Sequence, residues 1–191
     1  DEDLVVIWKP AGLLSVPARK EGGHLNIQGF VRRITGAALP VHRLDQDTSG
    51  LMMVAQTERA QEALKAQLEV HSVERRYLAI VRGRPRENAW TERNHLVRNR
   101  GDGRRGTRED AEPEDGRLAV SHFSVRERLG KKASLVEATL ETGRTHQVRI
   151  HLAECGHSVL GDRLYGSRSG HLGARRLSLH AVVLGFKHPR T

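Results

Sequence analysis

The chain has 191 residues, which is enough for one domain with a substantial core or for two small lobes. No apolar run approaches the roughly 20 residues that span a bilayer, and no secretory signal is visible, so we expect a cytoplasmic protein. The net charge of +9 favours a polyanionic partner, nucleic acid before a membrane surface, because no basic amphipathic helix carries bulky apolar anchors. The single cysteine, Cys155, excludes an internal disulfide and a cysteine-based zinc cluster, and we interpret it as a small buried hydrophobe.

The first third of the chain predicts strands and helices in alternation. Residues 4–8 form an apolar run that ends at the Pro- and Gly-containing turn 9–12. Residues 25–34 have near-helical apolar spacing with a glycine just past the end. The apolar run 51–55 predicts a buried strand, and Thr57 is a plausible N-cap for a helix to about residue 69.

The middle of the chain contains a long aperiodic segment. Residues 77–81 predict a strand, after which residues 86–116 lose periodicity and lead us to expect an excursion from the core, as a loop or hairpin. Its part 93–108 holds six arginines and one acid, and an acidic patch follows at 109–115. Two interpretations stay open for this part: a substrate-specific arm or a solvated loop.

The last third predicts paired strands and one helix. Apolar and polar residues alternate in 118–128 and 133–140, which predicts two paired strands around a turn at Gly130. A helix is predicted over 145–154, ended by Gly156, and a last buried strand over 177–186. The elements do not alternate regularly, so the predicted fold class is α+β with a mixed, mostly antiparallel sheet. No Gly-rich phosphate loop follows a strand, which argues against an ATPase or dinucleotide enzyme.

The polar stretch 42–50 is the first candidate site, because it puts Asp45 beside an arginine in a loop anchored by the strand 51–55. Asp45 is either a turn carboxylate that caps Thr48 or Ser49, or an ionised nucleophile or base. Asp47 is the local rival, and we interpret it as the structural cap.

The second candidate site lies a hundred residues further on, at 143–151. Arg149 either snorkels or makes a surface pair, or it is buried, and a buried Arg149 needs a carboxylate, which Asp45 would supply. In a helix over 145–154 Arg149 shares a face with Thr145. Tyr77 is either a core residue at a strand start or a ring on which an extruded base stacks.

Other chemistries have weak support in the sequence. His146 and His151 are five residues apart, which is poor spacing for joint metal ligation on a helix, and no HExxH pattern occurs. No G-x-S-x-G elbow indicates a Ser-His-Asp hydrolase. We therefore expect no metal.

At this point the chain resembles the RluA-type pseudouridine synthases, which isomerise uridine in ribosomal or transfer RNA. The block His-Arg-Leu-Asp-x-x-Thr-Ser-Gly at 42–50 is highly specific, as is its order with Gly-Arg-Thr-His-Gln-x-Arg at 143–149. The other matching segments run nearly end to end: Lys-Pro-Ala-Gly at 9–12, Tyr-Leu-Ala-Ile-Val-Arg-Gly at 77–83, Gly-Asp-Arg-Leu-Tyr-Gly at 161–166, Leu-His-Ala at 179–181 and His-Pro at 188–189.

The resemblance implies residue roles. Asp45 would be the essential aspartate, Tyr77 the ring that stacks on the base, and Arg149 the arginine paired with the aspartate. Arg43 would enter the RNA stack in place of the flipped base. Further RNA contacts would come from His42, Arg144, Thr145, His146 and Gln147. It also implies no metal, no organic cofactor, and a mostly antiparallel sheet with flanking helices, divided by the active-site cleft.

Some features lie outside this pattern. Trp8 stands where the family usually has asparagine. Many relatives carry an S4-type RNA-binding domain; none fits within the chain, so we expect one catalytic domain over residues 1–191, and a monomer, since no exposed apolar heptad is visible. The alternatives are a non-catalytic RNA-binding or RNA-folding module on the same fold, and a metal-dependent nuclease, which a chelator would inhibit.

Overall fold

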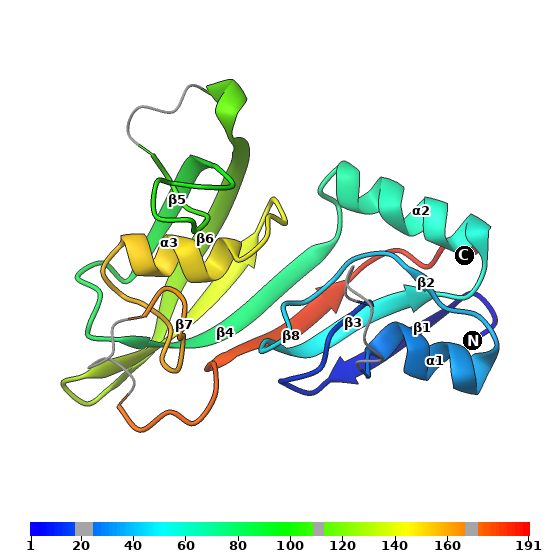
Figure 1. Cartoon of the computed structure of the whole chain (residues 1–191), viewed down its shortest axis with the longest axis horizontal. Coiled ribbons are helices and arrows are strands. Elements are labelled where there is room, and N and C mark those ends of the chain that lie inside the picture. Colours follow the sequence, from blue (N-terminus) through cyan, green and yellow to red (C-terminus); the bar gives the residue numbers. More distant parts are fainter. Residues whose placement is uncertain (18–24, 109–112, 167–171) are drawn as a thin grey trace. The chain divides into compact units, whose positions relative to one another are not determined.

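The computed structural model describes residues 1–17, 25–108, 113–166 and 172–191, and the chain forms two compact units (Figure 1). Unit one comprises Asp1–Arg75 and His180–Thr191, and unit two comprises Arg76–Leu179. The first and last segments of the chain therefore fold together. Four acidic-patch residues, 109–112, lie outside the described residues.

The sheet of unit one is built around β3, Ser49–Ala55. β1, Leu4–Lys9, and the short β2, Leu39–Pro40, pair with it antiparallel, and β8, Leu179–Gly185, pairs with it in parallel. The apolar run 51–55 predicted this strand correctly. β2 escaped prediction because two residues ending in proline give no period and remove one ladder donor.

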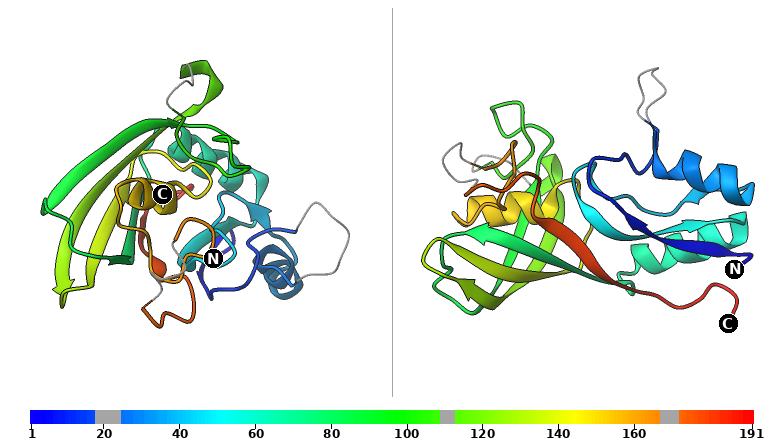
Figure 2. Two further views of the ribbon diagram at one scale, coloured as in Figure 1. Left: turned by 60° about the vertical axis from the view of Figure 1, so that its left-hand side comes forward. Right: turned by 90° about the horizontal axis from the view of Figure 1, so that it is seen from below.

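Two helices flank this sheet, on opposite faces (Figure 2). α1, Ile27–Thr35, begins where the Asn26 side chain accepts a hydrogen bond from a backbone N–H and ends at the left-handed Gly36. α2, Glu58–Glu69, has the predicted Thr57 N-cap. Alternate residues of β3 turn to opposite faces, and its odd-numbered apolar residues pack with α2: the cluster includes Met53, Ala55, Ala60 and Leu64.

Unit two is an antiparallel sheet in the order β4-β7-β6-β5. These strands are β4, Glu74–Arg82, which starts at the end of unit one, β5, Ala89–Leu96, β6, Arg117–Leu129, and β7, Ala133–Leu140. The predicted pair around Gly130 is confirmed as β6 and β7. Within the segment 86–116, β5 pairs with β6 over eight residues, so only the residues after Leu96, including a 3-10 turn at Pro113–Asp115, depart from the sheet.

One helix covers a face of this second sheet (Figure 2). α3, Gln147–Glu154, buries Val148 and Leu152 against apolar residues of the strands: Ala79, Val81, Phe123, Val136 and Ala138. It starts two residues later than predicted because His146 has a left-handed backbone, with φ of 61°. Thr145 therefore lies outside the helix and shares no helical face with Arg149.

Helices and strands together make the predicted α+β fold with a mixed sheet: β3 and β8 pair in parallel, and the other strand pairs described above are antiparallel. The described helices are all too short or too polar to cross a membrane.

Candidate active site

In unit one, Asp45 lies in a loop that is fixed on both sides. The backbone of Leu44 is bound by the Ser15 hydroxyl, which donates to its carbonyl at 2.7 Å and accepts from its N–H at 3.1 Å. On the other side, the N–H of Gly12 donates to the Gln46 carbonyl at 2.9 Å, and the Gln46 amide returns a bond to the Gly12 carbonyl at 3.1 Å. Asp45 itself is half-buried, so a carboxylate is held in place while it stays accessible.

Lys9 anchors the same loop from below. Its side chain has no exposed surface, and its Nζ donates to the carbonyl oxygens of Pro10 and Leu13 at 2.9 and 2.8 Å and to that of Gln46 at 2.8 Å. Burial lowers the pKa of Lys9 to about 8, against the opposing charges of two nearby aspartates, so it is still mainly an ammonium at pH 7. Three N–H donors thus meet three acceptors next to Asp45.

Of three other residues in the stretch 42–50, one supports the loop and two lie at the surface. The His42 Nε2 accepts a hydrogen bond from the Met53 N–H at 3.1 Å, and burial, followed by the charge of Arg75, lowers the pKa of His42 to about 4. A neutral His42 therefore ties the loop to β3. Arg43 is exposed. Asp47 is also exposed and forms no hydrogen bond with any described residue, so it is not the predicted cap.

In unit two, Arg149 is buried, with 8% of its surface exposed, and Asp162 supplies a carboxylate to it. The Arg149 Nε donates to one oxygen of Asp162 at 2.7 Å and its Nη2 to the other at 2.9 Å. The N–H groups of Leu164 and Tyr165 donate to the same carboxylate at 2.9 and 3.1 Å. Burial alone would raise the pKa of Asp162, but these bonds and the Arg149 charge lower it overall.

Tyr165 completes this cluster. The Arg149 guanidinium lies 5.2 Å from the centre of its ring, within the range of a cation–π contact. The Tyr165 hydroxyl lies 2.9 Å from the Nδ1 of His146, the residue with the left-handed backbone. Asp162 and Tyr165 therefore fix the orientation of Arg149 and of the turn before α3.

Gln147 and His151 form a buried network beneath that turn. The Gln147 oxygen accepts from the Thr142 hydroxyl at 2.8 Å and from the Arg144 N–H at 2.9 Å, and its amide donates to the Ser121 hydroxyl at 2.9 Å. Ser121 in turn lies 3.0 Å from the Nδ1 of His151. Gln147 is 2% exposed, so the structure gives it a supporting place under the turn, whereas the family resemblance implied an RNA contact.

The protonation of His151 follows from the same network. Its Nε2 lies 2.9 Å from the Asn94 oxygen and must carry a hydrogen, which leaves Nδ1 to accept from Ser121. Burial lowers the pKa of His151 to about 4, which agrees with a neutral ring.

The other predicted residues are nearer the surface. Thr145 is exposed, and Arg144 is half-buried, with its Nε donating to the Leu118 carbonyl at 2.9 Å. Tyr77 lies in β4 opposite Ala138, half-buried against the core of unit two. Asp45 belongs to unit one and Tyr77 and Arg149 to unit two, so the meeting of these three side chains stays a prediction.

Among the described residues, one group offers three potential metal ligands close together, Asp1, Asp3 and His188. These are already engaged, because His188 lies 2.9 Å from Asp1 and the Arg190 Nε lies 2.7 Å from Asp3. The group is far along the chain from every candidate catalytic residue.

Sequence reasoning missed three supporting residues. Lys9, Asp162 and Tyr165 were visible only as members of matched segments, without a role. The available signal was chemical: a lysine at the end of an apolar run, and an aspartate two and three residues before backbone N–H groups it can cap.

Each unit thus holds one candidate side chain in place: the Asp45 loop in unit one and the oriented Arg149 in unit two. The description "RNA pseudouridylate synthase" belongs to the family model that matches residues 3–154, and the chain belongs to that family. The predicted RluA-type resemblance is confirmed.

Similar proteins are known from several organisms. The Ribosomal large subunit pseudouridine synthase D of Zymomonas mobilis is 41% identical, over 99% of this chain and 63% of its own length. The Dual-specificity RNA pseudouridine synthase RluA of Haemophilus ducreyi is 33% identical, over 99% of this chain and 85% of its own length. The structure of Human RNA Pseudouridylate Synthase Domain Containing 1 matches 96% of this chain and 75% of its own, with a TM-score of 0.81 and 28% identity. The chain spans 63–64% of the length of the first curated relatives.

Proposed function

We propose that this protein is an RNA pseudouridine synthase that isomerises uridine in ribosomal or transfer RNA, with both units forming one catalytic domain. The observation that carries the proposal is the Asp45 loop, whose neighbours on both sides are hydrogen-bonded while the carboxylate stays accessible. The family match supports it, because residues 3–154 draw on both units.

In the proposed reaction, Asp45 attacks the ribose C1′ or assists cleavage of the bond between C1′ and N1 of uracil. The uracil rotates and rejoins through C5, and a proton leaves C5. Arg149 would neutralise Asp45, and Tyr77 would stack on the base and assist proton removal.

A uridine within an RNA stem must first be flipped out, at a cost of a few kcal/mol. Stacking on Tyr77, worth about 1–3 kcal/mol, and insertion of the exposed Arg43 would offset that cost. Thr145 and His146 lie at the turn before α3, where they would contact the RNA. We further propose a cytoplasmic monomer that needs no metal or organic cofactor.

The test is to incubate the protein with bulk RNA from cells that lack it and to map pseudouridine chemically. Asp45→Asn should reduce the product to background, and Asp47→Asn, an exposed aspartate two residues away, should leave the rate unchanged. Pseudouridine made by Asp45→Asn at the wild-type rate would overturn the assigned role. RNA binding without isomerisation on any RNA would favour the non-catalytic module, and loss of activity with a chelator would favour the nuclease or another metal enzyme.

A further inference from the structure

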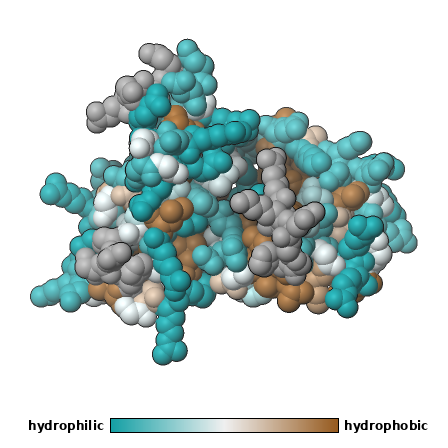
Figure 3. All heavy atoms as spheres, viewed as in Figure 1, coloured by the Kyte–Doolittle hydropathy of each residue, from teal (hydrophilic) through white to brown (hydrophobic). Residues whose placement is uncertain are grey.

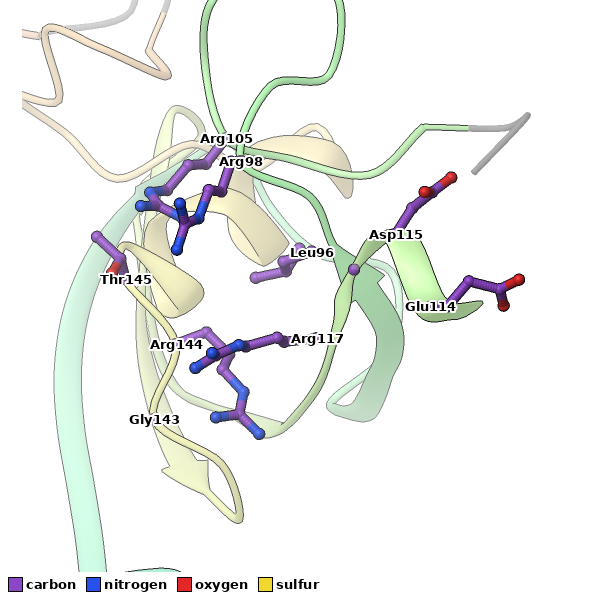
Figure 4. Close-up of a pocket in the computed structure, with 10 residues that line it drawn as sticks. Leu96, Arg98, Arg105, Glu114, Asp115, Arg117, Gly143, Arg144 and Thr145 are labelled. Atoms are coloured by element: carbon purple, nitrogen blue, oxygen red, sulfur yellow. The ribbon is translucent and has the colours of Figure 1, made fainter. Parts of the chain in front are cut away.

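Unit two contains an arginine-lined cavity that the proposed reaction does not use. It has a volume of about 430 Å³ and receives four arginines from three separate segments (Figure 4). Arg98 and Arg105 come from the loop after β5, Arg117 from the start of β6, and Arg144 from the turn before α3. The surface of this part of unit two is mainly hydrophilic (Figure 3).

The loop that carries Arg98 and Arg105 is fixed rather than loosely attached. Val97 and Gly106 close it with an antiparallel bridge, whose shorter bond, from the Val97 N–H to the Gly106 carbonyl, is 2.9 Å. Glu154, the last residue of α3, accepts a hydrogen bond from the Thr107 N–H at 2.9 Å. The two arginines therefore leave a loop that is tied to α3.

The same anchoring explains Gly106. A Cβ at this position would lie 2.6 Å from the Cδ of Arg100 and 2.9 Å from the Oε1 of Glu154, so a side chain would displace those of Arg100 and Glu154. On the opposite wall, the bond from the Arg144 Nε to the Leu118 carbonyl fixes a third guanidinium.

The positive charges of this cavity are not neutralised by the described residues. No described carboxylate lies within 4.0 Å of the guanidinium nitrogens of Arg98, Arg105, Arg117 or Arg144. The two acids on the wall, Glu114 and Asp115, point away from the arginines in Figure 4. Asp115 lies instead 3.5 Å from Arg108. Four like charges around one space repel one another unless an anion enters it.

The chemistry of the wall selects the kind of anion. Guanidinium groups bind phosphate oxygens through paired N–H donors. Of the described residues that line the cavity, none is aromatic, so it offers no ring on which a base could stack. We propose that this cavity holds backbone phosphates of the RNA substrate, away from the reacting uridine; the RNA identity of the ligand rests on the proposed function.

The test compares two double variants with the same loss of charge. Arg98→Gln/Arg105→Gln removes two guanidinium groups from the cavity. Arg84→Gln/Arg86→Gln removes two exposed arginines of unit two that do not line it. Circular dichroism and thermal unfolding establish that both are folded, and binding of a fluorescently labelled RNA stem-loop is measured between about 50 and 200 mM salt.

The cavity variant should bind the stem-loop at least about tenfold more weakly at the lower salt, because two charged hydrogen-bonding groups are lost. The slope of its log affinity against log salt concentration should be smaller in magnitude by about 1.4 to 1.8, since each lost phosphate contact removes about 0.7 to 0.9 from that slope. The control should stay close to wild type. With an isomerised RNA, the cavity variant should raise KM and leave kcat unchanged.

Equal losses in both variants would mean that general charge attracts the RNA, and would overturn the proposal. Unchanged RNA binding by the cavity variant would overturn the proposal as well. If inorganic phosphate then bound the wild type and not the variant, the cavity would be a site for small anions and not for RNA. Absence of isomerisation on any RNA would refute the proposed activity, and the binding comparison would still decide the cavity.

Discussion

Replacement of Asp162 by asparagine tests a buried charge pair in unit two. Asp162 is 1% exposed, and one of its oxygens accepts the 2.7 Å bond from the Arg149 Nε. The other oxygen accepts from the Arg149 Nη2 and from the N–H groups of Leu164 and Tyr165. Asparagine can keep these last three bonds, but its NH2 group then faces the Arg149 Nε, donor against donor.

The expected cost is that of breaking a buried ion pair by removing one partner, about 3–5 kcal/mol of unfolding free energy. A double-mutant cycle with Arg149→Met isolates the pair, because any other contact of Arg149 is lost equally on both sides of the cycle. The double variant should be less destabilised than the sum of the single variants, by about 2 kcal/mol or more.

The assay is urea unfolding at pH 7, followed by fluorescence in a Trp8→Phe background, where the remaining tryptophan, Trp90, lies in unit two. The matched control is Asp102→Asn. Asp102 also accepts from an arginine Nε and Nη2, at 3.2 and 3.0 Å, but its side chain is 46% exposed. An exposed pair of this kind contributes about 0–1 kcal/mol, so the control should lose little.

The pH dependence gives a second readout. Because the folded-state pKa of Asp162 lies below its ordinary 3.8, the pair stabilises the protein above that value and is lost as the pH falls through the folded pKa. Asp162→Asn should flatten this acid limb. Equal effects of Asp162→Asn and Asp102→Asn, or strict additivity in the cycle, would refute the assigned role of the pair.

Three further predictions concern the supports of the two sites. Lys9→Met removes a donor from three carbonyl oxygens, of which only that of Gln46 keeps another, the Gly12 N–H. It should cost about 3 kcal/mol or more in urea unfolding, whereas Lys65→Met, on the exposed face of α2, should be nearly neutral. Burial lowers the pKa of His151 from 6.5 to about 4, so the ring is neutral in the folded protein. The neutral ring stabilises the fold fully above pH 6.5, and this stabilisation, on the order of 3 kcal/mol, is lost as the pH falls to about 4. Urea unfolding of His151→Gln should not show this loss. Gly50→Ala should fail to fold or lose at least about 2 kcal/mol by thermal unfolding, because φ is 122° and the new Cβ would lie 2.2 Å from the Ala181 carbonyl oxygen; a soluble variant of wild-type stability would contradict the register of β3 and β8.

The sequence predicted those parts of the fold whose signal is local. The N-cap Thr57, the stop at Gly36 and the alternation on either side of Gly130 each depend on residues a few positions apart, and each is confirmed. β5 was missed because its residues alternate weakly: a strand at the edge of the sheet pairs on one side only and carries polar side chains.

The sequence predicted which residues belong to the two candidate sites, but not which of them support the fold and which are available for chemistry. Arg149 was expected to be paired if buried, and it is, with Asp162, a partner thirteen residues along the chain. No periodicity connects a helix to a carboxylate in the following loop. Similarly, Gln147 appears in the sequence as one more polar residue, and only its four internal hydrogen bonds identify it as a support.

This division indicates why the two motif blocks are so specific. Several of their polar members face inward: His42 binds β3, Gln147 and His151 bind β6, and Arg149 binds Asp162. A buried polar group must find a partner of one shape and one hydrogen-bonding pattern, so few substitutions are tolerated at such positions. A residue that only touches RNA faces water on its other side and can change more freely. These inward-facing residues therefore belong to the scaffold that holds Asp45 and Arg149. On our proposal, RNA affinity would also depend on surfaces outside the two blocks, such as the arginine cavity, where three of the four guanidinium groups belong to neither block.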